Sequence, residues 1–265
     1  MFPHLIDLGP LHIATYGVLV AAAYLLGILW LKSERERMRL SEDDFWSLIY
    51  SLFFGALAGA KLLFILLNWR SYASGEMGLL RDFRYGFVFY GGCLGMFAAG
   101  VLWCRSKKLG RGDYLRLADY FGVAVPLGLW LGRVGCLAAG CCYGRPTALP
   151  WGIRFTRPDC LVPPGLQGVA LHPAQLYEAV GDIAIAAVLW RTLRAVQAGR
   201  LKTGAVIYGY CLLYAALRFS VEFFRGDDRG GALAGLSPSQ WIAVGFAATV
   251  GALAWRRGFR AGRAA

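Results

Sequence analysis

Long apolar runs alternate with short polar connections along almost the whole chain. A run of roughly 20 residues crosses about 30 Å of hydrocarbon as a helix, and seven stretches approach or exceed that length. They lie at about 11–31, 45–68, 86–104, 115–135, 172–190, 204–222 and 238–255. This pattern predicts an all-α, polytopic integral membrane protein with about seven transmembrane helices, and we expect residues 1–265 to form a single transmembrane domain.

Basic residues collect in every second connection between these runs. They follow the first, third, fifth and seventh runs: Lys32, Arg35, Arg37 and Arg39; Arg105, Lys107, Lys108, Arg111 and Arg116; Arg191, Arg194, Arg200 and Lys202; and Arg256, Arg257, Arg260 and Arg263. These positions hold 17 of the 28 Lys and Arg residues. Because Lys and Arg concentrate in cytoplasmic loops, we expect the N-terminus outside and the C-terminus in the cytoplasm.

The composition agrees with a chain whose exterior meets lipid. Hydrophobic residues make up 57% of the sequence and charged residues only 17%, below the roughly 25% of soluble domains. The net charge of +12 would also suit a nucleic-acid binder, but that class needs a basic face on a folded domain. Basic loops beside an anionic leaflet explain the charge, so we expect no nucleic-acid partner.

Ionisable residues occur inside several of the apolar runs, where each is costly unless it meets a partner or a water-filled cavity. They are Lys61, Asp119, Arg133, Glu178, Asp182, Arg218 and Glu222. Arg133 and Arg218 lie near the outer ends of their runs, and two guanidinium groups suit a phosphodiester such as a phospholipid headgroup. A simpler interpretation is an intrahelical ion pair between Arg218 and Glu222, which are four residues apart.

The connection at about 137–171 is rich in Gly, Pro and Cys and lies on the outer side in this topology. A loop of this length is more often functional than passive. Glycines around Arg133 permit close approach of a ligand, although helix packing would use them equally well. The segment 172–178 opens the fifth run, either as part of a headgroup site or as an anchor at the membrane interface.

Four cysteines, Cys136, Cys141, Cys142 and Cys160, lie in or near this outer loop together with His172. They suit a metal, a disulfide or packed free thiols. The spacing C-x4-C-C matches no familiar metal motif, and there is no P-loop or dinucleotide fingerprint. We therefore assign no metal ligands and expect no cofactor.

Taken in order, these segments resemble the prolipoprotein diacylglyceryl transferases of bacterial inner membranes. The matching motifs are LGP at 8–10, YG at 16–17, DY at 119–120, GRVG at 132–135, HPAQLYE at 172–178, RFSVEFFR at 218–225 and LSPSQ at 236–240. The resemblance implies transfer of the diacylglyceryl group of phosphatidylglycerol to the lipobox cysteine thiol of preprolipoproteins, with release of glycerol phosphate. It also implies a multi-pass protein of the inner membrane, in contact with membrane lipids and with its active site open toward the outer leaflet.

The resemblance further assigns site residues. The catalytic ones are Arg133, Arg218, Tyr90, Tyr16 and Glu222. The substrate-binding ones are Arg133, Gly91, Gly92, Gly135, Gly144, His172, Gln175, Tyr177 and Glu178.

Some residues depart from the family pattern. Tyr90 stands where the family commonly has histidine, Cys136, Ala139 and Cys141 replace polar residues, and Lys61 replaces an arginine. Histidine, with a pKa near 6.5, accepts a thiol proton more readily than tyrosine, with a pKa near 10, so we expect Tyr90 to position or donate a hydrogen bond. Two alternatives stay open: a diverged lipid-binding or transport paralogue, and an outward-facing thiol or metal protein that uses the cysteine cluster.

Overall fold

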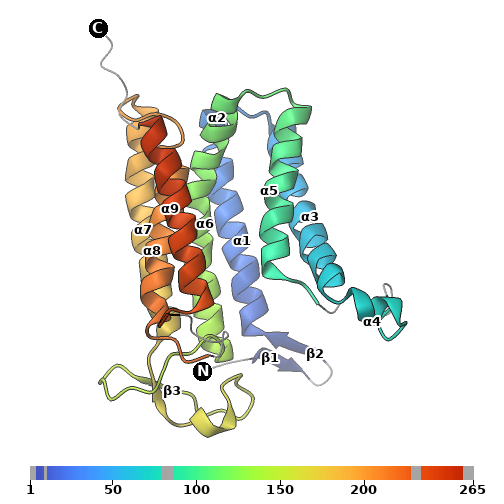
Figure 1. Ribbon diagram of the computed structural model, residues 1–265, viewed down its shortest axis with the longest axis vertical. Helices are drawn as coiled ribbons and strands as arrows, with labels where there is room; N and C mark the ends of the chain where they lie inside the picture. Colours follow the sequence, from blue (N-terminus) through green and yellow to red (C-terminus); the bar gives the residue numbers. More distant parts are fainter. Residues whose placement is uncertain (1–3, 9–10, 79–85, 228–233, 259–265) are drawn as a thin grey trace. The chain divides into compact units, whose positions relative to one another are not determined.

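The computed structural model describes residues 4–8, 11–78, 86–227 and 234–258 of the chain (Figure 1). Its long helices are α1 (Thr15–Ser33), α3 (Glu42–Leu67), α5 (Phe89–Ser106), α6 (Arg111–Ala139), α7 (Ala174–Gln197), α8 (Ala205–Glu222) and α9 (Pro238–Arg257). Each overlaps one of the predicted apolar runs, so the predicted all-α class is confirmed. The first predicted run, 11–31, is wrong at 11–14, because β2 (Leu11–Ala14) pairs antiparallel with β1 (His4–Leu8) and the helix begins at Thr15.

Within the described residues, α1, α3, α6 and α8 are long and apolar enough to cross a membrane. The helices α5, α7 and α9, of 18, 24 and 20 residues, occupy the other three predicted runs. The chain is therefore a polytopic helical membrane protein. Seven spans, and the sides on which the termini lie, stay predictions.

The chain divides into two compact units, and the single-domain expectation stays a prediction. The first unit comprises Met1–Leu31 and Leu115–Ala265. In it, α8 packs against both α7 and α9. The helix α1 lies close to α6, since a Cβ at Gly128 would meet the carbonyl oxygen of Ala23 at 3.1 Å. Small residues allow membrane helices to approach in this way.

The second unit, Lys32–Tyr114, is built on the packing of α3 against α5, with short helices α2 (Arg35–Met38) and α4 (Trp69–Ala73). Each long helix has two glycines four residues apart, Gly55 and Gly59 on α3 and Gly91 and Gly95 on α5. A Cβ added at any of these four positions would collide with the facing helix. This contact is the small-xxx-small packing typical of membrane helices.

The carboxylate of Asp119 on α6 is buried, and its hydrogen-bond partners are backbone N–H groups at the start of α8. Asp119 is 1% exposed and accepts hydrogen bonds from the backbone nitrogens of Gly204, Val206 and Ile207, at 2.6, 3.1 and 2.9 Å. The first N–H groups of a helix lack partners within the helix, and a carboxylate both satisfies them and complements the positive helix end. Asp119 therefore fixes α8 against α6.

The Gly-, Pro- and Cys-rich connection folds into a small structure of its own. The helix α6 continues to Ala139, so the non-helical part begins later than predicted. Strand β3 (Ile153–Arg154) pairs with β4 (Ala170–Leu171), and η1 (Pro164–Leu166) lies between them in sequence. Phe155, Cys160, Val162 and Leu171 form a hydrophobic core under this loop.

Candidate functional site

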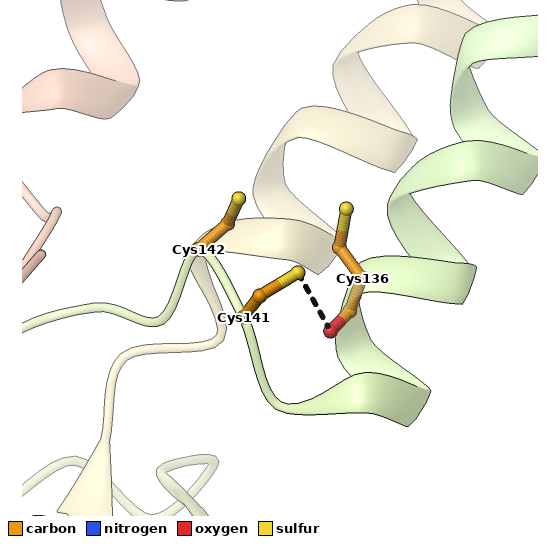
Figure 2. Close-up of side chains that lie close together, drawn as sticks. All are labelled: Cys136, Cys141 and Cys142. Atoms are coloured by element: carbon orange, nitrogen blue, oxygen red, sulfur yellow. Dashed lines mark hydrogen bonds between the residues drawn. The ribbon is translucent and has the colours of Figure 1, made fainter. Parts of the chain in front are cut away.

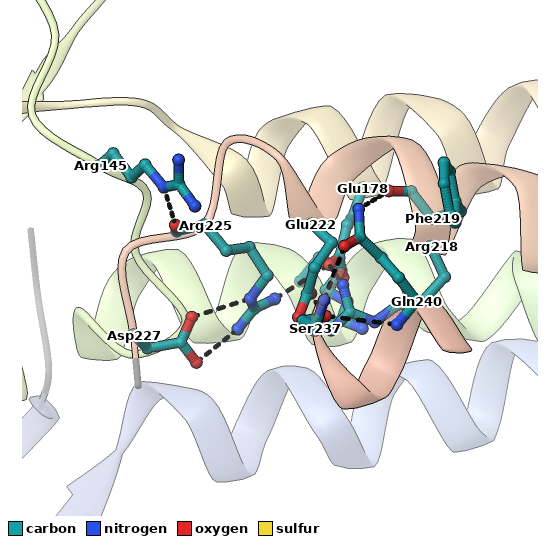
Figure 3. Close-up of polar contacts among 10 residues, drawn as sticks. Arg145, Glu178, Arg218, Phe219, Glu222, Arg225, Asp227, Ser237 and Gln240 are labelled. Atoms are coloured by element: carbon teal, nitrogen blue, oxygen red, sulfur yellow. Dashed lines mark hydrogen bonds and ion pairs between the residues drawn. The ribbon is translucent and has the colours of Figure 1, made fainter. Parts of the chain in front are cut away.

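The carboxylate of Glu178, five residues into α7, is surrounded by three arginines. Its Oε2 pairs with Nε of Arg133 on α6, and its Oε1 lies 3.4 Å from Nη1 of Arg218 on α8. The same Oε1 lies 3.0 Å from Nη1 of Arg225, just beyond the end of α8 (Figure 3). The Glu178 side chain is only 3% exposed. One buried carboxylate thus joins three segments that are far apart in sequence.

The expected ion pair between Arg218 and Glu222 within α8 is present, but Arg218 also has a second carboxylate partner. Nη2 of Arg218 lies 2.7 Å from Oε2 of Glu222, while Nη1 of the same guanidinium faces Glu178. The hydroxyl of Ser237 donates to Glu222 Oε1 at 2.8 Å. Ser237 is also the N-cap of α9, in a capping box with Gln240, so the start of α9 orients the Glu222 carboxylate.

Arg225 was not selected from the sequence, because it lies outside the helices and its contacts depend on the tertiary fold. Its Nε and Nη2 donate to the two carboxylate oxygens of Asp227 at 2.8 and 2.9 Å. Burial acts to lower its pKa, but the hydrogen bonds to Asp227 and the Cys142 thiol raise that pKa above the usual range. The Arg225 side chain, 3% exposed, is a permanent cation fully engaged by protein groups.

Gly144 positions Arg225 through the backbone. It forms an antiparallel bridge with Arg225, and the next residue, Arg145, donates from Nε to the Arg225 carbonyl at 2.9 Å. A Cβ at Gly144 would collide with the backbone of His172 and would lie 2.7 Å from the carbonyl oxygen of Phe224. Three backbone segments therefore pack so closely at Gly144, a predicted site residue, that a side chain there would not fit.

Arg133 and Arg218 differ from Arg225 because each keeps an exposed part. Their side chains are 18% and 14% exposed. Arg133 meets Glu178 through Nε. Among the described residues, no atom lies within 4 Å of where a Cβ of Gly132 would be, apart from its chain neighbours and the backbone of its own helix. Two partly exposed arginine side chains, held by a shared carboxylate, are suited to bind an anionic group such as a phosphodiester.

Two further residues near Arg133 were not selected as site residues from the sequence. The Tyr214 phenol of α8 lies near enough to Arg133 to interact with it electrostatically. Asp182, one turn beyond Glu178 on α7, is fully buried, and neither of its carboxylate oxygens has a hydrogen-bond partner among the described residues. The sequence could have indicated Asp182, because it is one of the ionisable residues inside the apolar runs. It could not have indicated Tyr214, because the run that contains Tyr214 has several aromatic residues.

The predicted substrate-binding residues at the start of α7 make contacts that anchor the outer loop. Nδ1 of His172 lies 3.2 Å from the Tyr177 hydroxyl, which also accepts a hydrogen bond from Nε1 of Trp151 at 2.9 Å. Gln175, 1% exposed, donates to the carbonyl of Cys141 at 2.8 Å. These side chains hold the outer loop against the start of α7. Their role in substrate binding stays a prediction.

Three of the four outer cysteines lie together. The sulfurs of Cys136, Cys141 and Cys142 all lie within 4.8 Å of one another (Figure 2). Cys160 instead belongs to the hydrophobic core of the loop. The Cys141 thiol donates to the backbone carbonyl of Cys136, with 3.7 Å between sulfur and oxygen (Figure 2).

Tyr16 and Gly135, both predicted site residues, are in contact. The ring of Tyr16, at the start of α1, covers Gly135, where a Cβ would meet it at 3.2 Å. The Tyr16 hydroxyl lies within electrostatic range of Arg133 and the three thiols. Tyr16 therefore stands beside the arginine cluster, and 44% of it is exposed.

The remaining predicted residues belong to the second unit. Tyr90 lies in the first turn of α5 and is 58% exposed. Gly91 lies in the contact with α3 described above, and Gly92 has the carbonyl of Ala56 at 3.4 Å from its Cβ position. Lys61 is buried, with its ammonium 5.4 Å from the ring centre of Phe64. Catalytic and binding roles for Tyr90, Gly91 and Gly92 stay predictions.

Fold and site together define a polytopic helical membrane protein that buries a network of arginines and carboxylates between its helices, with two arginines left partly open to an anionic group. The family model described as prolipoprotein diacylglyceryl transferase matches residues 3–256. The chain therefore belongs to the prolipoprotein diacylglyceryl transferase family.

Individual relatives agree over most of their length. A phosphatidylglycerol–prolipoprotein diacylglyceryl transferase of Clostridium tetani is 34% identical over 245 residues, which cover 92% of this chain and 93% of the relative. The protein of the same name from Geobacter sulfurreducens is 37% identical over 234 residues, covering 86% and 85%. That of Idiomarina loihiensis is 32% identical over 244 residues, covering 89% and 85%.

Proposed function

We propose that this chain transfers the diacylglyceryl group of phosphatidylglycerol to the lipobox cysteine thiol of preprolipoproteins, the first step of bacterial lipoprotein maturation. The observation that carries the proposal is the pair of partly exposed arginine side chains, Arg133 and Arg218, which share the carboxylate of Glu178. The family membership of the whole chain supports the same reaction.

In this reaction a carbon–sulfur bond forms and a carbon–oxygen bond to phosphate breaks. The sulfur of the acceptor cysteine attacks the glyceryl carbon, and the electron pair of the breaking bond leaves on the phosphate oxygen of glycerol phosphate. Negative charge therefore grows on the phosphate as the bond breaks. Arg133 and Arg218 bind that phosphate, and a low-dielectric site makes such charge stabilisation strong.

The proton of the acceptor thiol needs a base. Glu222, whose carboxylate is held by Arg218 and Ser237, accepts this proton directly or through a water. Tyr90 and Tyr16 position the reacting groups by hydrogen bonding, since a phenol with a pKa near 10 is a poor base at neutral pH. The predicted substrate-binding residues of the same unit, Gly135, Gly144, His172, Gln175 and Tyr177, shape the approach to the arginines.

The enzyme works in the bacterial inner membrane with seven spans, and its site opens toward the outer leaflet. Support comes from the alternation of basic connections, which places the α6–α7 loop outside. That loop covers the ends of the helices that present the arginines. A prolipoprotein arriving from outside and a phospholipid of the outer leaflet would meet there.

The proposal is tested with purified protein in micelles that contain phosphatidylglycerol and a lipobox cysteine peptide. Mass spectrometry reads the diacylglyceryl mass on the peptide, and release of glycerol phosphate is measured alongside. Loss of one group that stabilises the transition-state charge costs about 10²–10³ in rate. We expect at least a hundredfold loss for Arg133→Ala and Arg218→Ala, and none for Arg191→Ala, which is exposed on α7.

Binding of phosphatidylglycerol without any modified peptide would instead identify a diverged lipid-binding paralogue. Full activity of both arginine variants would contradict the proposed site.

A further inference from the structure

The cluster of Cys136, Cys141 and Cys142 is not used by the proposed reaction, because the nucleophile of that reaction belongs to the substrate. Cys136 lies in the last turn of α6, while Cys141 and Cys142 follow the helix end. Gly140 and Cys142 both have left-handed backbone conformations, with φ of +79° and +60°, and these turn the chain back toward α6. The turn brings together three sulfurs that the sequence spacing alone did not assign to any motif.

The positions of these sulfurs suit a metal ion better than a disulfide. Around a zinc ion with Zn–S bonds of about 2.3 Å, tetrahedrally arranged sulfurs are about 3.8 Å apart. The three sulfurs here lie within 4.8 Å of one another, so a shift of about 1 Å closes them around one ion. A disulfide needs two sulfurs at about 2.05 Å and leaves the third thiol unused.

The cluster is held in place by groups around it. The backbone nitrogen of Cys141 donates to the carbonyl of Cys136 at 3.1 Å, and Gln175 donates to the carbonyl of Cys141 at 2.8 Å. Cys136 is buried and the other two are half-buried, which shields the site without closing it. Such outer contacts orient metal ligands and are as much a part of a metal site as the ligands.

The charges near the cluster also suit metal-bound thiolates. The Arg225 guanidinium interacts with the Cys142 thiol, and Arg133 precedes Cys136 by less than one helical turn. Three thiolates with one divalent ion carry a net negative charge, and neighbouring guanidinium groups stabilise it. Soft thiolate ligands select thiophilic ions such as Zn²⁺ and Cu⁺ over Mg²⁺ or Ca²⁺.

We propose that Cys136, Cys141 and Cys142 form a binding site for a single thiophilic metal ion, with all three sulfurs as ligands. Three protein ligands leave the fourth position of a tetrahedral ion open, as in catalytic rather than structural zinc sites. The ion lies beside the arginine cluster, since Arg133, three residues before Cys136 on α6, pairs with Glu178.

The test uses the full-length protein in detergent, reduced and freed of metal. It is titrated with Co²⁺ as a spectroscopic probe for Zn²⁺, and in a second arm with Cu⁺ against a competing chelator. We expect one ion per chain and, for Co²⁺, the thiolate-to-cobalt charge-transfer absorption that reports sulfur ligation. Competition by Zn²⁺ or retention of Cu⁺ then identifies the preferred ion.

The single variants Cys141→Ser and Cys142→Ser should each weaken binding at least tenfold and reduce the charge-transfer band. Cys93→Ser, at an exposed cysteine on α5, is the matched control and should bind as the parent does. Elution as a single species on gel filtration verifies that each variant is folded. No binding by the reduced parent, unchanged binding by both serine variants, or a disulfide between two cluster cysteines in the protein as isolated would overturn the proposal.

This test measures metal binding and does not measure transfer of the diacylglyceryl group. Failure of the metal site therefore leaves the proposed transferase reaction intact, and failure of the transferase reaction leaves the metal site intact.

Discussion

Replacing Glu178 with glutamine removes the charge on which three guanidinium groups converge. The amide keeps the shape of the side chain and one oxygen acceptor, but it cannot pair with Arg133, Arg218 and Arg225 at once. Because Glu178 is 3% exposed, water cannot replace the lost charge. Breaking a buried ion pair from one side costs about 3–5 kcal/mol, and the retained oxygen places the expected loss near the lower figure, about 3 kcal/mol.

That loss corresponds to a fall of roughly 6–12 °C in the unfolding midpoint, using about 2–4 °C per kcal/mol for large domains. The assay is thermal unfolding in detergent, followed by the fluorescence of the nine tryptophans. Glu42→Gln is the matched control: Glu42 pairs with Lys32 at 3.5 Å, and the two side chains are 59% and 45% exposed. An exposed pair contributes at most about 1 kcal/mol, so its midpoint should change little.

Unfolding of Glu178→Gln at the parent's midpoint would refute this prediction, because the carboxylate would then not be stabilising the three guanidinium groups around it. A fall equally large in Glu42→Gln would refute it too, since burial would then not be the cause.

Two further predictions concern groups that position the site. Gly144→Ala places a methyl group against the backbone of His172 and Phe224, and overpacking of about 1–3 kcal/mol should lower both the unfolding midpoint and transferase activity. Gly245→Ala, on α9 with nothing near its Cβ position, is the control and should keep both. Asp119→Ala removes the carboxylate that caps α8 and should cost about 1–2 kcal/mol in the same unfolding assay, and an unchanged midpoint would show that the cap contributes nothing.

The helices could be predicted from the sequence because apolar runs of membrane length leave the backbone only one way to satisfy its hydrogen bonds in lipid. The predicted run at 238–255 and the helix Pro238–Arg257 begin at the same residue, and in the structure Ser237 and Gln240 form a capping box at this helix start, with Pro238 in the first turn. The pairing of His4–Leu8 with Leu11–Ala14 was missed because Leu11–Ala14 is as apolar as the helix that follows it.

The site was predictable only in part. Arg133, Arg218, Glu178 and Glu222 stood out because charged groups are costly inside apolar runs. Arg225 lies outside the runs and is selected by its contacts with Glu178 and Asp227, which exist only in the folded chain. In the same way, the grouping of Cys136 with Cys141 and Cys142, and the separate burial of Cys160, depend on how the outer loop turns back on α6.

The most direct measurement is complementation of a bacterium depleted of its own prolipoprotein diacylglyceryl transferase, with a reporter lipobox cysteine analysed by mass spectrometry. The parent chain and Arg133→Ala are compared at equal membrane levels. We predict that the parent adds the diacylglyceryl mass to the reporter and that Arg133→Ala inserts but adds none. Full modification by Arg133→Ala, or no modification by correctly inserted parent protein supplied with its native lipids and a native lipobox substrate, would contradict this account.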